Sequence, residues 1–274
     1  MMMQALSSPS RAGTVTRSFR SKSSMQQFDS IEAFNAPRPC VCTIGAFDGV
    51  HLGHQQLIRH VVSQARAQGA LAVVLTFFPH PRAVLGRAPE RYLTLPEEKA
   101  EHIAALGVDV LITHPFTLAT ARITAEDFLA LLLRHLRLTS LWVGPDFALG
   151  HNRQGDVTWL RARGAQHGFE VNVLPPLVLG HARISSSRVR DALLRGDIGD
   201  ANLCLGRPFR VRGEYDGERT ICTHPKQWLP GPGTYTALIE ARALEVSLTS
   251  DAPCTLRLEH PLPGGARPLV VTFV

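Results

Sequence analysis

Two histidines in the stretch GAFDGVHLGH, residues 45–54, stand three positions apart just after an apolar run. His51 and His54 fall where the next amphipathic segment begins, at the amino end of a predicted helix. Such an end has unpaired N–H donors and a partial positive charge, so it attracts anions. Gly49 and Gly53 let the backbone approach a ligand closely. The stretch therefore predicts a polyphosphate site, with turn or capping histidines as the alternative.

A second helix start of the same kind lies in RISSSRVRDALLRGD, residues 183–197. Ser185 or Ser186 is expected to cap an amphipathic helix there. The hydroxyl of Ser187 and the guanidinium of Arg190 can then bind a phosphate. One capping serine is usually structural, but two anion-binding helix starts in one chain favour a functional site.

Two more loops, TFFPHP (76–81) and GPDFALGHNRQGD (144–156), follow apolar runs. Their prolines also suit the end of a strand, and core packing explains Phe77, Phe78 and Phe147 equally well. None of these loops holds a serine in a nucleophile elbow, a GxxxxGKS/T phosphate loop or a GxGxxG turn. The sequence therefore disfavours P-loop kinases and Rossmann oxidoreductases.

Apolar strands alternate with amphipathic helices from residue 40 onward. We expect strands at 40–47, 71–77, 108–113, 140–144 and 169–175, and helices at 54–69, 96–107, 124–137 and 155–167. This repetition predicts an α/β fold, with a parallel sheet covered on both faces. Ligands of such sheets bind beyond the carboxyl ends of the strands, which is where the loops 45–54, 77–82 and 144–153 should meet.

The pattern changes after residue 206. Short alternating runs broken by Gly and Pro predict a small antiparallel barrel or sandwich over residues 207–274. We therefore expect a boundary near 206, with the α/β domain covering 25–206.

The composition restricts the class of protein further. The net charge is +6, but the acid-free head, residues 1–24, supplies four of these charges, so the rest lacks the basic surface of a nucleic-acid-binding protein. The head has the composition of a transit peptide, or is disordered sequence upstream of a start at Met25. No apolar run is long enough to span a membrane. The five cysteines include no CxxC pair and suit reduced thiols in the cytoplasm. The oligomeric state is left open.

Four ordered motifs carry a family resemblance. TIGAFDGVHLGH, FFPHP, VGPDFALGHNRQGD and ISSSRVR resemble the FMN adenylyltransferase module of bacterial FAD synthetases, which belongs to the HxGH nucleotidyltransferase superfamily with its Rossmann-like parallel sheet. The resemblance covers roughly residues 25–206. It implies an enzyme that transfers AMP from ATP to FMN, giving FAD and pyrophosphate, without a covalent intermediate.

The resemblance also implies roles for particular residues. His51, His54, Ser187 and Arg190 would be catalytic, with Ser187 standing where the family has threonine. The nucleotide site would contain Gly45, Phe47, Asp48, Gly49, Gly53, Asp146 and Ser186. The flavin site would contain Phe77, Pro79, His80, Pro81 and Phe147. Mg²⁺ would act through the phosphate oxygens of ATP, with no metal ligand from the protein.

The family usually adds a riboflavin kinase barrel, and residues 207–274 stand in its place. Where the kinase has a Gly-x-Pro-Thr-Ala-Asn stretch, this chain reads GERTICTHPKQW, without the Thr and Asn after Pro225. Arg257 stands where the kinase has its glutamate, and Glu259 is two positions out of register. We expect a degenerate barrel without kinase activity. The alternatives are a bifunctional kinase and adenylyltransferase, an HxGH transferase with another phosphate acceptor, and a sensor of flavin or nucleotide without turnover.

Overall fold

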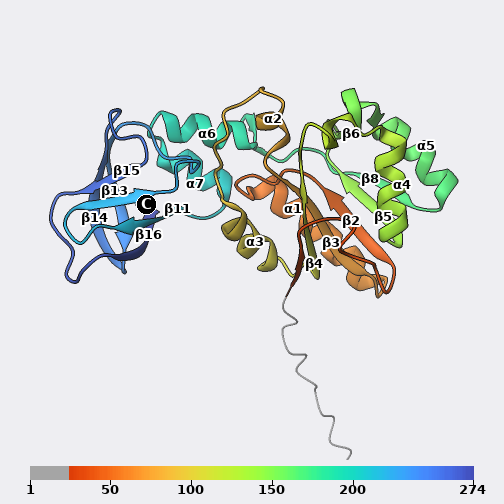
Figure 1. Cartoon of the computed structure of the whole chain (residues 1–274), viewed down its shortest axis with the longest axis horizontal. Helices are drawn as coiled ribbons and strands as arrows, with labels where there is room; N and C mark the ends of the chain where they lie inside the picture. Colours follow the sequence, from red (N-terminus) through yellow and green to blue (C-terminus); the bar gives the residue numbers. More distant parts are fainter. Residues whose placement is uncertain (1–24) are drawn as a thin grey trace, which may run out of the picture.

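Six parallel strands form the amino-terminal sheet in the computed structural model, which describes residues 25–274 (Figure 1). Runs rich in Val, Ile and Leu form the central strands, and all five residues of β2 are buried. The strands are β1 (Gln26–Phe28), β2 (Cys40–Ile44), β3 (Leu71–Phe78), β4 (Val110–Pro115), β5 (Leu138–Val143) and β8 (Glu170–Val173). The predicted head, residues 1–24, lies outside the described residues.

The strands lie in the order β1-β4-β3-β2-β5-β8. The chain passes from β2 to β3 and β4 on one side, and later to β5 and β8 on the other, so the order reverses between β2 and β5. Ligands of open α/β sheets bind at such a reversal, beyond the carboxyl ends of the strands. The loops after β2 and β5 meet there and line one cavity, as the sequence predicts.

Helices cover both faces of the sheet. Residues of β3 alternate between the two faces: Val74 packs with buried residues of α1 and α3, and Val73 and Leu75 pack with those of α4 and α5. The helices are α1 (Leu52–Ala67), α3 (Pro96–Ala104), α4 (Ala125–His135) and α5 (Val157–His167). The predicted α/β class is confirmed.

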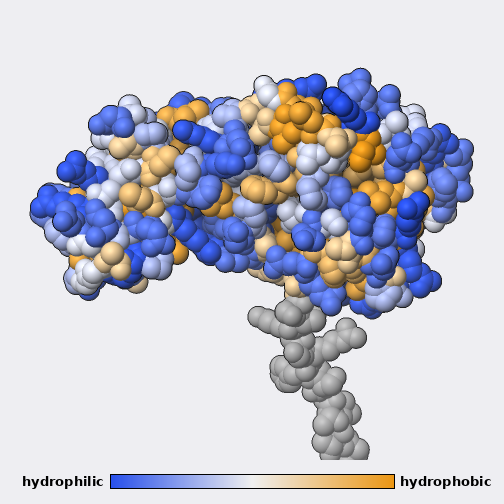
Figure 2. Space-filling view, viewed as in Figure 1, coloured by the Kyte–Doolittle hydropathy of each residue, from blue (hydrophilic) through white to orange (hydrophobic). Residues whose placement is uncertain are grey.

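Short elements lie around the carboxyl edge of the sheet. They are α2 (Pro81–Val84), the 3-10 turns η1 (Thr120–Arg122) and η2 (His151–Arg153), and two small antiparallel pairs, β6 (Ala148–Leu149) with β7 (Gly155–Asp156) and β9 (Val178–Leu179) with β10 (Ala182–Arg183). Hydrophobic residues gather on the surface between α2 and β6 in Figure 2.

The carboxy-terminal strands close into an antiparallel barrel, which confirms the second predicted domain type. Its order is β11-β12-β15-β14-β13-β16, with β11 (Phe209–Tyr215), β12 (Thr220–Thr223), β13 (Gly233–Ile239), β14 (Arg242–Leu248), β15 (Thr255–Leu258) and β16 (Arg267–Phe273). Buried and exposed residues alternate along these strands, as the period of two requires.

Two helices connect the sheet to the barrel, α6 (Ser186–Leu194) and α7 (Ile198–Leu205), and both lie between them in Figure 1. Val189 and Leu193 of α6 and Ala201 of α7 belong to the same core as the barrel interior. The predicted boundary at 206 falls between α7 and β11, and apolar packing is continuous across it.

Two further sequence expectations concern the described residues, 25–274. Cys40 and Cys42 are buried against the α4 face of the sheet, and all five cysteines are free thiols. Within this range no helix is long and apolar enough to cross a bilayer.

Candidate active site

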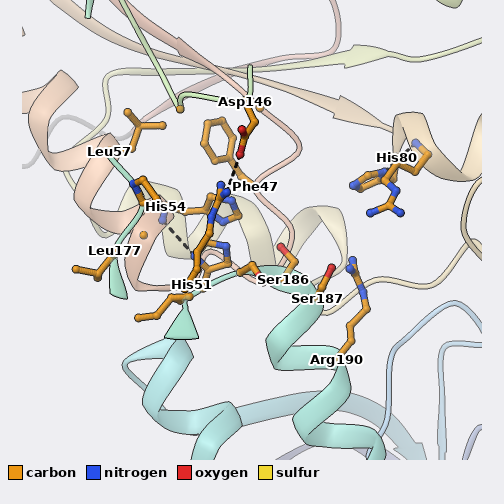
Figure 3. Close-up of a pocket in the computed structure, with 18 of the residues that line it drawn as sticks. Phe47, His51, His54, Leu57, His80, Asp146, Leu177, Ser186, Ser187 and Arg190 are labelled. Atoms are coloured by element: carbon orange, nitrogen blue, oxygen red, sulfur yellow. Dashed lines mark hydrogen bonds and ion pairs between the residues drawn. The ribbon is translucent and has the colours of Figure 1, made fainter. Parts of the chain in front are cut away.

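A cavity of about 540 Å³ lies where the carboxyl ends of β2 and β5 face the amino ends of α1 and α6 (Figure 3). Both predicted anion-binding helix starts open into it. His51 and His54 come from the first, and Ser185, Ser186 and Ser187 from the second. The fold therefore joins two motifs that are more than a hundred residues apart in the sequence.

The rings of His51 and His54 lie face to face, with centroids 3.6 Å apart and planes inclined by 17°. His51 is the N-cap of α1, and its Nδ1 accepts a hydrogen bond from the backbone N–H of His54 at 3.3 Å. Because Nδ1 is the acceptor, the proton of the neutral ring is on Nε2, where it is a donor. Gly53 leaves room for this ring, since a Cβ there would lie 3.3 Å from it.

The histidines of this cavity are neutral at physiological pH. Burial lowers the pKa of His51 to about 4, and the nearby Arg183 adds to the effect. Burial also lowers the pKa of His54 well below its ordinary value, assisted by His51 and Lys99. On the far side of the cavity in Figure 3, burial lowers the pKa of His80 to about 4. The imidazoles are therefore hydrogen-bonding groups rather than fixed cations.

The loop between β2 and α1 has an unusual backbone. Phe47 and Val50 are non-glycine residues with positive φ angles of 48° and 41°. This conformation is costly and requires support from its surroundings. Asp48, which is 1% exposed, provides that support, because its Oδ1 accepts the backbone N–H groups of Leu93 and Thr94 at 3.0 and 3.3 Å.

An arginine from the connection to the barrel supports the same loop. The Arg207 guanidinium donates to the backbone oxygens of Gly49 at 2.7 Å and Val50 at 3.1 Å. Burial lowers its pKa to about 10, which leaves it charged at neutral pH. The sequence reasoning missed Arg207, because its role depends on contacts distant in the sequence.

The start of α6 is fixed by serines. Ser185 is the N-cap, with its hydroxyl accepting the backbone N–H of Arg188 at 3.2 Å. The Ser186 hydroxyl donates to the backbone oxygen of Asp48 at 2.9 Å and joins the two helix starts. Ser187 and Arg190 line the cavity, and Arg190 is paired with the Asp48 carboxylate.

Some cavity residues were missed by the sequence reasoning. Arg183 forms an ion pair of 2.6 Å with Asp146 across the mouth of the cavity, and Trp228 reaches the cavity from the barrel half. Arg82 and Arg91 add two more guanidinium groups. Arg183 begins the quoted RISSSRVRDALLRGD segment, and its charge beside a phosphate motif was the available signal. Trp228 had no such signal.

A second cavity of about 390 Å³ adjoins the first. The two share Ile44, Arg82 and Phe147 in their walls. Its lining is mostly apolar and includes Phe77, Pro81, Phe116, Phe128 and Leu149. Figure 2 shows hydrophobic surface between α2 and β6, and both of these elements contribute to the lining of the second cavity.

The predicted site residues fall into three groups. The first cavity is lined by Gly45, Phe47, His51, Gly53, His54, His80, Asp146, Phe147, Ser186, Ser187 and Arg190. Phe77 and Pro81 line the second cavity, together with Phe147. Asp48, Gly49 and Pro79 line neither. Asp48 and Gly49 lie behind the wall of the first cavity, where they hold the loop through Leu93 and Thr94.

Comparison with known proteins agrees with this architecture. Residues 33–188 match the family model for FAD synthetase. A bifunctional riboflavin kinase/FMN adenylyltransferase of Escherichia coli strain K12 is 38% identical over 177 residues, covering 64% of this chain and 56% of that protein. The protein of the same name from Pseudomonas fluorescens is 34% identical over 215 residues, covering 77% of this chain and 66% of that protein. The alignment with the Escherichia coli relative thus spans little more than half of that relative's length.

A solved structure shares the fold over most of the chain. A macrolide-efflux protein from Streptococcus pneumoniae superposes with a TM-score of 0.76 at 23% identity, covering 91% of this chain and 89% of that one. At this identity the likeness concerns the fold alone. The family match covers more than half of the chain and includes both helix starts of the cavity. The chain belongs to the FAD synthetase family.

Proposed function

We propose that this protein is an FMN adenylyltransferase, which transfers AMP from ATP to FMN and releases pyrophosphate. The main support is the convergence of the amino ends of α1 and α6 on one cavity, with His51, His54, Ser187 and Arg190 in its wall. Helix amino ends, imidazole N–H groups and a guanidinium all bind phosphate oxygens. A nucleoside triphosphate is the ligand that these phosphate-binding groups fit best.

The proposed reaction forms one bond and breaks another. A phosphate oxygen of FMN attacks the α-phosphorus of ATP, and the bond from that phosphorus to the oxygen bridging to the β-phosphorus breaks. Both electrons of that bond leave with pyrophosphate. The protein contributes positioning and donors that stabilise the charge on the transferring group. His51 offers an Nε2–H donor, because its Nδ1 is occupied by the cap of α1.

The flavin ring is assigned to the second cavity. Its apolar lining suits a large flat aromatic ring, and Phe77 and Phe147 provide faces for stacking. The shared wall at Phe147 would let the FMN phosphate enter the first cavity and reach ATP. Pro79 and His80 belong to the segment that leads into α2, and His80 is the N-cap of that helix.

Mg²⁺ is expected to enter with ATP. Among residues 25–274 no three His, Cys, Asp or Glu side chains are grouped as metal ligands. Mg²⁺ commonly keeps several waters and binds substrate phosphates, so the ion would be held through the phosphate oxygens of ATP. The ion would neutralise phosphate charge, while the protein's own residues hold the nucleotide. A cytoplasmic location fits the free thiols and stays part of the proposal.

The experiment is an assay with ATP and Mg²⁺ in which FMN and riboflavin are offered separately and the products are resolved. We expect FAD from FMN and no FMN from riboflavin. Pyrophosphate release with another phosphate acceptor, but not with FMN, would favour a different HxGH transferase. Tight binding of ATP and FMN without turnover would favour a sensor.

A further inference from the structure

A segment of the barrel half, residues 224–231, crosses to the wall of the first cavity. We call it the strap. It occupies the position of the missing kinase stretch, between β12 and β13. Gln227, Leu229, Pro230 and Gly231 are buried, so the second half of the strap is packed into the protein.

One side of the strap is hydrogen-bonded to the segment around Tyr92. The backbone N–H of Tyr92 donates to the Lys226 oxygen at 2.8 Å, and that of Trp228 donates to the Tyr92 oxygen at 2.8 Å. The buried Gln227 amide adds hydrogen bonds to the oxygens of Tyr92 and Leu93 at 3.3 and 3.1 Å. Leu93 is one of the residues whose backbone N–H binds Asp48.

The other side of the strap is hydrogen-bonded to the carboxyl end of α6. The backbone N–H of Gly231 donates to the Leu193 oxygen at 2.9 Å. A Cβ at Gly231 would lie 2.3 Å from the Leu194 oxygen, so only glycine fits this approach. The strap thus bridges the segment that holds Asp48 and the helix that carries Ser187 and Arg190.

Trp228 is the strap residue that reaches the cavity. The Arg190 guanidinium carbon lies 5.6 Å from the centroid of its ring, which is within the range of a cation–π contact. Arg190 is therefore held by the Asp48 carboxylate and by the Trp228 ring. Each of the two is fixed by the same stretch of chain around Leu93.

We infer that Trp228 is a positioning residue of the adenylyl-transfer site. The strap, which belongs to the barrel half, thereby supports the first cavity of the α/β half. Trp228 acts through Arg190, whose guanidinium it orients toward the phosphates of the nucleotide. The inference rests on the proposed function for its substrate. Its geometric part, the Trp228–Arg190 contact at a nucleotide cavity, needs only that ATP binds there.

The test is a set of four variants in the full-length chain. Trp228→Ala is expected to lower kcat/KM for FAD formation about tenfold, the effect of losing a partly buried cation–π contact. Trp228→Phe, which keeps an aromatic face, should recover most of it. In an Arg190→Ala background, Trp228→Ala should have no additional effect, because its partner is already gone.

Trp159 supplies a matched control. The Arg163 guanidinium lies 5.4 Å from the Trp159 ring, so this pair has the same chemistry on α5, away from the cavity. Trp159→Ala should leave kcat/KM unchanged once thermal unfolding shows that the variant is folded. Wild-type kcat/KM in Trp228→Ala, or a full tenfold loss from it in the Arg190→Ala background, would overturn the inference.

A binding measurement separates this inference from the proposed function. Titration of ATP should change the tryptophan fluorescence of the wild type and much less that of Trp228→Phe, and calorimetry should give weaker ATP binding to Trp228→Ala. If these results are obtained while no FAD is ever formed, the proposed function fails and the role of Trp228 stands. If FAD is formed and ATP binds Trp228→Ala as tightly as the wild type, the role of Trp228 fails.

Discussion

The Arg190 guanidinium is bound by the carboxylate of Asp48, a side chain that is 1% exposed and lies behind the cavity wall. The same carboxylate accepts two backbone N–H groups, so it fixes the loop that carries His51 as well as the arginine of α6. One buried carboxylate thereby sets the relative position of two helix starts. A charge pair of this kind is costly to disrupt from one side, because the remaining charge stays buried.

Replacing Asp48 by Ala should destabilise the fold strongly. The change leaves Arg190 and the backbone N–H groups of Leu93 and Thr94 without their acceptor, and we expect a loss of about 3 kcal/mol in the free energy of unfolding. Asp48→Asn keeps one acceptor oxygen and should lose less. Urea unfolding of the two variants measures the difference, and equal stability of Asp48→Ala and the wild type would contradict this role.

Replacing His54 by Ala should reduce adenylyl transfer by about two orders of magnitude or more, the usual effect of removing one donor to a transition-state charge. The fold should stay intact, since His54 is not the cap of α1. Steady-state kinetics with FMN and ATP and a thermal unfolding curve are the measurements. Near-wild-type turnover would exclude the assigned role.

Variants of His51 can separate an effect on stability from an effect on activity, because this residue both caps α1 and faces the cavity. His51→Ala should lose activity and about 1 kcal/mol of stability, whereas His51→Asn should lose activity and keep the cap. Comparison of the two unfolding curves isolates the cap. Equal stability of the two variants would argue against the capping role.

Acid should destabilise the protein through its buried histidines. The pKa of His80 is about 4 in the folded protein, below the ordinary value near 6.5, so the unfolded chain binds more protons between these values. Stability should therefore fall as the pH drops from about 6.5 toward 4 and be independent of this group above that window. His80→Asn, which can still accept the N–H of Arg82, should flatten the slope by up to about 1.4 kcal/mol per pH unit. Denaturant unfolding at several pH values tests this, and an unchanged slope would contradict it.

Removal of divalent metal should abolish turnover without changing the stability of the free protein. Mg²⁺ is proposed to bind through ATP, so EDTA should stop FAD formation and leave the unfolding temperature unaltered. Added Mg²⁺ should restore the rate. A large decrease in the unfolding temperature with EDTA would point instead to a metal held by the protein itself.

The barrel should not phosphorylate riboflavin. Lys226 and Trp228 stand where the kinase stretch has its Thr and Asn. The Lys226 ammonium is paired with Glu90, and the backbone N–H of Trp228 donates to the Tyr92 oxygen. Glu259 lies just beyond β15 with a side chain that is 70% exposed, paired only with the neighbouring His260 in the described part of the chain. Riboflavin with ATP and Mg²⁺ should give no FMN by chromatography. Steady FMN formation would restore the bifunctional alternative.

Local patterns in the sequence were enough to predict the sheet, its helices and the barrel. The continuous apolar run of β3, the alternation within β11, the glycine after α1 and the serines before α6 are each local patterns, so they can be recognised directly in the sequence. The same holds for the two helix starts, since capping is a local interaction. Element boundaries shifted by a few residues, as with the strand expected at 40–47, which ends at Ile44.

The supports of the site could not be predicted in the same way. Arg207, Trp228 and the Asp48–Arg190 pair depend on contacts between residues that are far apart in the sequence. Their residue types are also common in ordinary solvated or core positions. Only the packing of α6 and α7 against the barrel brings these side chains to the loop after β2.

The shared core of α6, α7 and the barrel has a consequence for how the molecule can be divided. A fragment ending at Gly206 would retain His51, His54, Ser187 and Arg190, yet Val189 and Leu193 would lose their apolar neighbours. The helix that presents half of the proposed phosphate-binding groups would then be held by α7 and its own amino end, without the barrel core. The barrel core packs against α6, so the barrel would remain necessary for the site even without any kinase activity.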